Sequence, residues 1–140
     1  MEMYMVKSIA ELTFGGDFDP EQFRQLVAGL GGERDDVYWD VVMQRGDSVV
    51  WIDILPAVPG RMSHFDVVER LLGSEPCYRV MLHGSSNGAS EWLIAEVVVA
   101  ASEKWKLVLL GFDEQPITMA ELDKRIARRT EGLLWSRRGR

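Results

Sequence analysis

The chain has 140 residues, a length that fits one domain and leaves little room for a second. Apolar residues make up 46% and charged residues 27%, proportions that are typical of globular proteins and exclude an intrinsically disordered body. The longest apolar stretch, residues 92–101, is interrupted by Glu96 and is about half as long as the roughly 20 residues that a membrane helix needs. The sequence therefore predicts no membrane span.

Negative charge is concentrated in the body of the chain. Residues 1–123 hold 9 Lys and Arg against 21 Asp and Glu, a formal charge of −12, whereas residues 124–140 hold 7 basic residues and one acid, a charge of +6. A body this acidic repels phosphate backbones and attracts basic partners over about 8 Å in physiological salt. This argues against nucleic acid as its partner. The basic end fits a helix C-terminus, and a nucleic-acid or membrane-surface role for it stays open.

The N-terminus and the cysteine content bear on location. The first seven residues contain Glu2 and show no basic region followed by an apolar core, so the sequence predicts no secretory signal. The single cysteine, Cys77, excludes a disulfide within the chain and a zinc site built from several cysteines. Both features predict a reducing, cytoplasmic setting.

The chain begins with a predicted strand and helix. Residues 3–14 alternate loosely between apolar and polar types and end at two glycines, which is typical of a strand. Asp19 and Pro20 suit the N-cap and the first position of a helix, and Gln22 completes a capping-box-like pattern. The apolar stripe of this helix recurs at helical spacing and comprises Phe23, Leu26, Val27 and Leu30.

A β-hairpin is predicted next. Residues 37–44 and 48–55 are rich in β-branched and aromatic types. The three residues 45–47 separate them and include Gly46, a connection that is typical of bulged hairpins. The two stretches therefore predict an antiparallel pair.

Helices and strands alternate in the second half. Ser63 begins a predicted short helix over residues 63–72, and residues 77–83 predict a strand. Residues 89–103 predict a helix whose nearly uniform apolarity implies burial on most sides. Residues 106–112 form a continuous apolar run, typical of a strand covered on both faces.

The last predicted helix begins at Thr118 with a capping box to Glu121. The element order is then β-α-β-β-α-β-α-β-α. Residues 77–112 predict a β-α-β unit with parallel strands and a right-handed crossover. With the antiparallel hairpin, this unit predicts a mixed sheet in a single α+β domain over residues 1–134, followed by a basic tail at 135–140.

A candidate catalytic site lies at the carboxyl end of the β-α-β unit. His83 ends one strand, Ser85 follows it, and Asp113 ends the returning strand. Ligands gather at such strand ends, and these three side-chain types are the ones that nucleophilic catalysis uses. The loop lacks the G-x-S-x-G, G-x-G-x-x-G and P-loop motifs, so its small polar residues equally fit a turn that caps a helix. The sequence predicts no cofactor.

Metal binding finds little support in the sequence. The only histidines, His64 and His83, are far apart in the chain. The acid pairs at residues 35–36 and 113–114 lack the ligand spacing of a calcium loop. The sequence therefore predicts no metal site.

The predicted hairpin combines tryptophans with acids and is the candidate partner-binding face. Tryptophan is enriched in binding hot spots, and an acidic rim steers a cationic partner. Buried tryptophans in an ordinary core are the alternative interpretation. The candidate contacts are Asp35, Asp36, Trp39, Asp40, Asp47, Trp51 and Asp53.

Part of the second half resembles a known class of proteins. Residues 90–93, residues 103–110, Asp113 and residues 117–122 form a helix, a tryptophan-containing turn, an apolar strand followed by an acid, and a capped helix. This arrangement resembles the C-terminal halves of bacterial immunity proteins from polymorphic-toxin and contact-dependent inhibition systems. The resemblance covers about a third of the chain and transfers no site residue. It implies a cytoplasmic antidote that binds and blocks one cognate toxin, often a cationic nuclease, without catalysis.

Two hypotheses therefore follow from the sequence. The first is a non-catalytic binding protein of the immunity type, whose acidic surface neutralises a basic toxin. The second is a small hydrolase or ligand-binding domain that uses His83, Ser85 and Asp113. The first accounts for the charge of the body and for the missing catalytic motifs.

Overall fold

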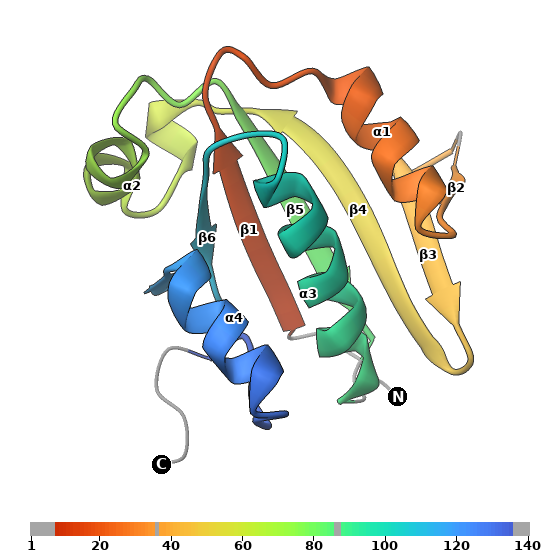
Figure 1. The fold of residues 1–140 in the computed structure, drawn as a ribbon. Coiled ribbons are helices and arrows are strands. Elements are labelled where there is room, and N and C mark those ends of the chain that lie inside the picture. The colour runs from red at the N-terminus through yellow and green to blue at the C-terminus, as the bar shows by residue number, and fades with distance from the viewer. Residues whose placement is uncertain (1–7, 36, 86–87, 136–140) are drawn as a thin grey trace.

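A seven-stranded sheet forms the centre of the computed structural model, which describes residues 8–35, 37–85 and 88–135. The strands within these residues are β1 (Ser8–Phe14), β2 (Glu33–Arg34), β3 (Val41–Arg45), β4 (Ser48–Pro56), β5 (Tyr78–Gly84), β6 (Leu107–Leu110) and β7 (Pro116–Ile117). They lie in the order β2-β3-β4-β5-β1-β6-β7. The first strand of the described residues, β1, therefore lies inside the sheet, between β5 and β6 (Figure 1).

Every neighbouring pair among the described strands is antiparallel. Strands β5 and β6 both run antiparallel to β1, so they point in the same direction, but β1 separates them. The sheet is thus antiparallel and not mixed, which corrects the prediction, whereas the α+β class and the antiparallel hairpin are confirmed. The position of β1 inside the sheet stabilises it. Its residues Ala10, Leu12 and Phe14 are fully buried, and neighbouring strands pair with both of its edges.

Helices cover the two faces of the sheet unequally. The helices of the described residues are α1 (Pro20–Gly29), α2 (Phe65–Leu72), α3 (Ala89–Ser102) and α4 (Met119–Ala127), with a 3₁₀ turn at Pro59–Arg61. Figure 1 shows α1, α3 and α4 on the face nearer the viewer, where they enclose the main core with Leu12, Ile52 and Leu109. Helix α2 packs on the opposite face, where Val108 and Leu110 form a small second core with it.

Side-chain caps fix the starts of α1 and α4 as predicted. The Asp19 carboxylate accepts from the backbone N–H groups of Glu21 and Gln22 at 2.9 and 3.2 Å. The Thr118 hydroxyl accepts from the N–H of Glu121 at 3.1 Å.

The predicted start of the second helix at Ser63 is wrong. Helix α2 begins at Phe65, after His64, which has a left-handed φ of 59° and makes no side-chain cap. The end of α2 is as predicted, because Gly73 takes the left-handed conformation that commonly closes a helix.

The hairpin of β3 and β4 is tighter and shorter than predicted. Arg45 pairs with Ser48, so two residues, Gly46 and Asp47, make the turn in place of three. Gly46 has a φ of 61°, which glycine adopts without strain. Residues 37–40 do not join the strand, since Val41 is its first residue.

The end of the described chain packs into the domain. Leu133 and Leu134 are fully buried, and the Arg125 guanidinium donates to the carbonyl oxygens of Leu133 and Trp135. Of the predicted tail, Trp135 is part of these contacts, and residues 136–140 lie outside the described residues. None of the helices in the described ranges is long and apolar enough to cross a membrane.

Candidate functional site

The face of the sheet that carries α2 is the one on which several predicted site residues lie. Along β4, Val50 and Ile52 are fully buried on the side of α1 and α3, whereas Trp51 and Asp53 point to the other side and are half-buried. Helix α2 packs over β6 on that side, at the far end of the sheet from β3 and β4. The side chains of β4 on this face are therefore accessible.

Three aromatic rings meet there. Trp51 of β4 and His83 of β5 are partners in the strand register. The Trp39 ring, from the loop before β3, lies 6.4 Å from the Trp51 ring and 4.9 Å from the His83 ring, measured between centroids. We call Trp39, Trp51, His83 and the neighbouring Asp53 the aromatic patch.

Partial burial shifts both titratable groups of the patch away from their charged forms. Burial raises the pKa of the Asp53 carboxyl, with a further rise from the negative charge of Asp40, against an opposing effect of His83. Burial also lowers the pKa of the His83 imidazole, and the charge of Asp53 opposes this shift. The patch therefore holds a carboxylate whose charge the chain compensates incompletely.

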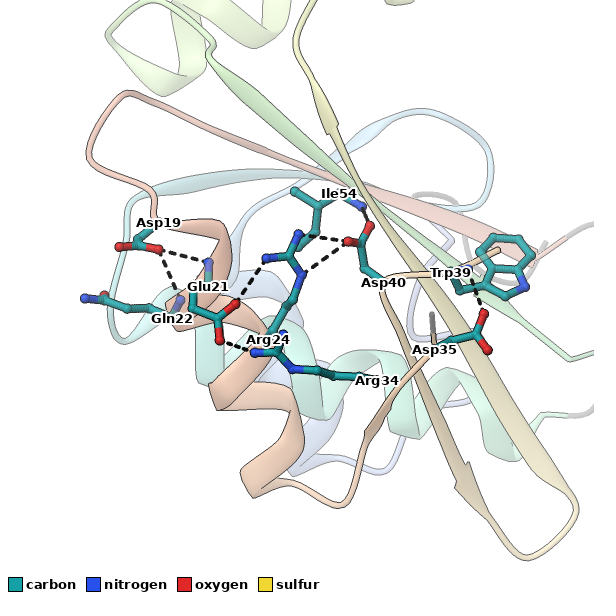
Figure 2. A network of polar contacts seen from close by, with 9 residues as sticks. All are labelled: Asp19, Glu21, Gln22, Arg24, Arg34, Asp35, Trp39, Asp40 and Ile54. Carbon is teal, nitrogen blue, oxygen red and sulfur yellow. Dashed lines mark hydrogen bonds and ion pairs between the residues drawn. The ribbon is translucent and has the colours of Figure 1, made fainter. Parts of the chain in front are cut away.

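Asp35 supports the patch by fixing the loop that carries Trp39. Its carboxylate accepts from the backbone N–H of Trp39 at 2.9 Å (Figure 2) and from that of Tyr38, also at 2.9 Å. These two hydrogen bonds, with that from Trp39 the larger cause, lower the pKa of the Asp35 carboxyl. The same loop presents the Tyr38 side chain to solvent, with 82% of its surface exposed.

Asp40, which the sequence predicts as a partner contact, has bonds within the domain. One of its oxygens accepts from two nitrogens of the Arg24 guanidinium, at 2.9 and 3.2 Å, and the other accepts from the N–H of Ile54 at 2.7 Å (Figure 2). Its charge is therefore used to join α1 to β4. Asp47 lies in the hairpin turn, apart from the patch, and Asp36 lies outside the described residues.

The three candidate catalytic residues have separate surroundings. The hydroxyl of Ser85 accepts from the N–H of Val49 at 3.0 Å, and the carbonyl of Ser85 accepts from the hydroxyl of Ser90 at 2.7 Å. His83 lies against the tryptophans of the patch, and Asp113 follows β6, on the other side of β1. The contacts of Ser85 tie β4 to the start of α3, which is a structural role.

Arginines of the chain pair with several acids of the body. Glu21 pairs with Arg24 and Arg34, and hydrogen bonds from Arg34 lower the pKa of the Glu21 carboxyl (Figure 2). Arg45 binds Glu96 at 3.0 Å. Several of the 21 acids of residues 1–123 are therefore paired with arginines that the net charge of −12 already counts, and the acids are spread over several elements and are not concentrated at the patch.

Two further facts bear on the chemistry of the site. Among the described residues, no three His, Cys, Asp or Glu side chains gather as metal ligands. Comparison with models of protein families, with curated proteins and with solved structures found no match to the chain. The residues themselves therefore carry the functional argument.

The sequence predicts Trp39, Trp51 and Asp53 as partner contacts and places His83 in a separate candidate site, whereas the structure brings the four side chains together. The strand register at β4 and β5 is what unites these four side chains. Along residues 78–84, Val80 and Leu82 are buried and His83 lies on the other face of the strand, as the two-residue period predicts. The sequence does not predict that this strand pairs with β4.

Proposed function

We propose that the protein is a non-catalytic binding protein of the immunity type, which uses the aromatic patch to bind and neutralise a basic toxin. The observation that carries this proposal is the half-buried pair Trp39 and Trp51 beside the carboxylate of Asp53, whose pKa burial raises. Tryptophans backed by a rigid scaffold are frequent hot spots of protein interfaces.

The electrostatics of the patch favour a cationic partner. A Lys or Arg side chain from a partner would contact the faces of Trp39 and Trp51 and pair with Asp53. The cationic side chain would neutralise the charge of Asp53. Because burial already disfavours that charge, as the raised pKa of Asp53 indicates, its neutralisation favours binding. The net charge of −6 of the whole chain would add attraction at longer range.

The rigidity of the patch also supports a binding role. Trp51 is in a strand that is hydrogen-bonded on both sides, by β3 and β5. The loop of Trp39 is held by Asp35. Side chains that are positioned before binding lose little conformational entropy in the complex, which raises affinity.

The reading frames beside this one are first inspected for a basic toxin domain, and a catalytically inactive variant of that domain is the test partner. We expect Trp39→Ala to weaken its binding at least about tenfold, and the association rate to fall about tenfold or more between low and high salt. The matched control is Trp92→Ala, since Trp92 is exposed on α3, on the opposite face of the sheet. Equal loss in the two variants, or an association rate independent of salt, would contradict the proposal.

A second measurement addresses catalysis. The protein and its His83→Ala variant are assayed with generic ester substrates. We expect no turnover above the uncatalysed rate from either. Turnover that disappears in the variant would contradict a non-catalytic function and would favour the hydrolase hypothesis.

A further inference from the structure

A second feature of the same sheet face, next to the aromatic patch, is a pocket of about 370 Å³. It lies where β1 and β5 meet the segment before α2 and the turn after β6. Such a volume is at the small end of the range for sites of small molecules, about 300 to 1,000 Å³. We call it the Glu11 pocket, after a residue at its base.

Four charged residues line this pocket, Glu11, Arg61, Arg79 and Glu114, and two of them, Glu11 and Arg79, form an ion pair with imperfect geometry. Arg79 Nε lies 3.2 Å from Glu11 Oε2, and each side chain is only 15% exposed. Neither of these two buried atoms makes a hydrogen bond of normal geometry. Burial raises the pKa of the Glu11 carboxyl in spite of the opposing charge of Arg79. The two charges attract each other, but the atoms that meet lack well-aligned hydrogen bonds, and a ligand that supplies such bonds recovers part of the free energy that burial of the pair costs.

The remaining donors of Arg79 have weak partners. Its Nη1 donates to the carbonyl of Arg61 at a long 3.4 Å, and its Nη2 contacts the sulfur of Met81 at 3.6 Å. A guanidinium carries five N–H donors in a planar fork that matches the two oxygens of a carboxylate. The two terminal nitrogens of Arg79 are therefore suited to bind the two oxygens of a carboxylate.

The rim of the pocket is held in an unusual backbone conformation. Glu114 lines the pocket with a φ of 62°, and His64, with a φ of 59°, places its Nε2 at 4.0 Å from the Glu114 Oε1. These are two of the three non-glycine residues with positive φ in the described chain. Left-handed conformations at such residues are strained and cluster at functional sites.

We propose that the Glu11 pocket binds a free α-amino acid. The carboxylate of the ligand would bind Arg79, and its ammonium group would bind Glu11 and Glu114, so both charges of the buried pair gain a partner. The walls supplied by Ile9, Leu110 and Phe112 are apolar and suit an aliphatic side chain. This site does not depend on the function of the aromatic patch, and either one can be wrong without the other.

The first experiment is a titration with ligands of matched shape, followed by protein NMR. The probes are L-leucine, 4-methylpentanoate, which lacks the amino group, and 3-methylbutylamine, which lacks the carboxylate. We expect leucine to bind at least about tenfold more tightly than either analogue. Equal affinity for leucine and one analogue, or no binding of leucine at about 20 mM, would overturn the proposal.

The second experiment uses variants of the pocket. Arg79→Lys keeps the charge but loses the planar fork, and we expect it to weaken leucine binding about tenfold. The double variant Glu11→Leu with Arg79→Met removes the ion pair as a unit, which usually preserves folding, and should abolish binding. The matched control is Arg45→Lys, in the ion pair with Glu96 outside the pocket, which should bind leucine as the wild type does. Unchanged binding in the double variant would show that the pocket is not the site.

Discussion

Arg24 of helix α1 binds Asp40 through two nitrogens, at 3.2 and 2.9 Å, while the second oxygen of Asp40 accepts from the N–H of Ile54 at 2.7 Å. This one carboxylate joins a helix, a loop and a strand that are far apart in the sequence. About three quarters of each of the two side chains is buried, so water screens the pair only partly. The contact positions the loop that carries Trp39.

Removing either member of this pair should destabilise the domain. We expect Arg24→Ala to lower the free energy of unfolding by about 1 to 2 kcal/mol, and Asp40→Ala by about 2 to 3 kcal/mol because the Ile54 N–H also loses its acceptor. The double variant, measured by urea denaturation, should cost about 1 kcal/mol less than the sum of the two. Simple additivity would show that the two side chains do not interact in solution.

Gly111 should be intolerant of any side chain. The N–H of its neighbour Phe112 donates to the carbonyl of Leu134 at 2.7 Å, and a Cβ on Gly111 would overlap that same carbonyl oxygen. The overlap is with backbone, which cannot rotate away, so we expect Gly111→Ala to cost about 2 kcal/mol or more. The measurement is thermal unfolding.

Gly29 is the matched control for this substitution. A Cβ there meets no atom within 4 Å, and Gly29 is the last residue of α1. Gly29→Ala should be neutral or stabilise by up to about 1 kcal/mol. If Gly111→Ala lowers the free energy of unfolding no more than Gly29→Ala does, the segment of Leu134 does not pack on Gly111 in solution.

The local elements of this fold could be predicted because each has a local physical cause. Asp19 and Thr118 cap their helices through side chains of fixed position in the sequence, and the apolar stripes follow from helical spacing. The order of the strands had no such cause. Strand β1 pairs with β5 and β6, which come more than sixty residues later in the chain, and no short-range pattern encodes that choice.

The candidate site was predictable to the same extent. Trp51 and Asp53 alternate along one strand, so their common face follows from the two-residue period. His83 lies beside them only through the register of β5, and the carboxylate of Asp40, a predicted partner contact, is bound by Arg24, sixteen residues away. Contacts between distant segments decide both outcomes.

Acid should destabilise the protein through His83. Because burial lowers the pKa of this imidazole in the folded state, the unfolded chain binds the proton more readily. Stability is then lost as the pH falls below about 6.5, the usual pKa of histidine, towards the lower folded value. The melting temperature of His83→Gln should therefore fall less than that of the wild type between pH 7 and pH 5. His64→Gln, at the exposed rim of α2, is the control, and an identical profile for His83→Gln and the wild type would contradict the assignment.

The carboxylate of Asp53 should destabilise the folded protein at neutral pH. Burial raises the pKa of its carboxyl, so the folded state favours the protonated form and loses stability as the pH rises from about 4 through the folded pKa. Asp53→Asn removes this penalty, and we expect its melting temperature to exceed that of the wild type at pH 7 and to match it near pH 3. The exposed Asp17 supplies the control variant Asp17→Asn, which should leave the melting temperature unchanged at both pH values.

The substitution Asp53→Asn should also weaken binding if the aromatic patch binds a cationic partner. The negative charge of Asp53 destabilises the free protein, but it is also the charge that such a partner neutralises, so the more stable Asp53→Asn protein should bind the partner more weakly. A variant that gains stability and keeps full affinity would separate this carboxylate from the binding function.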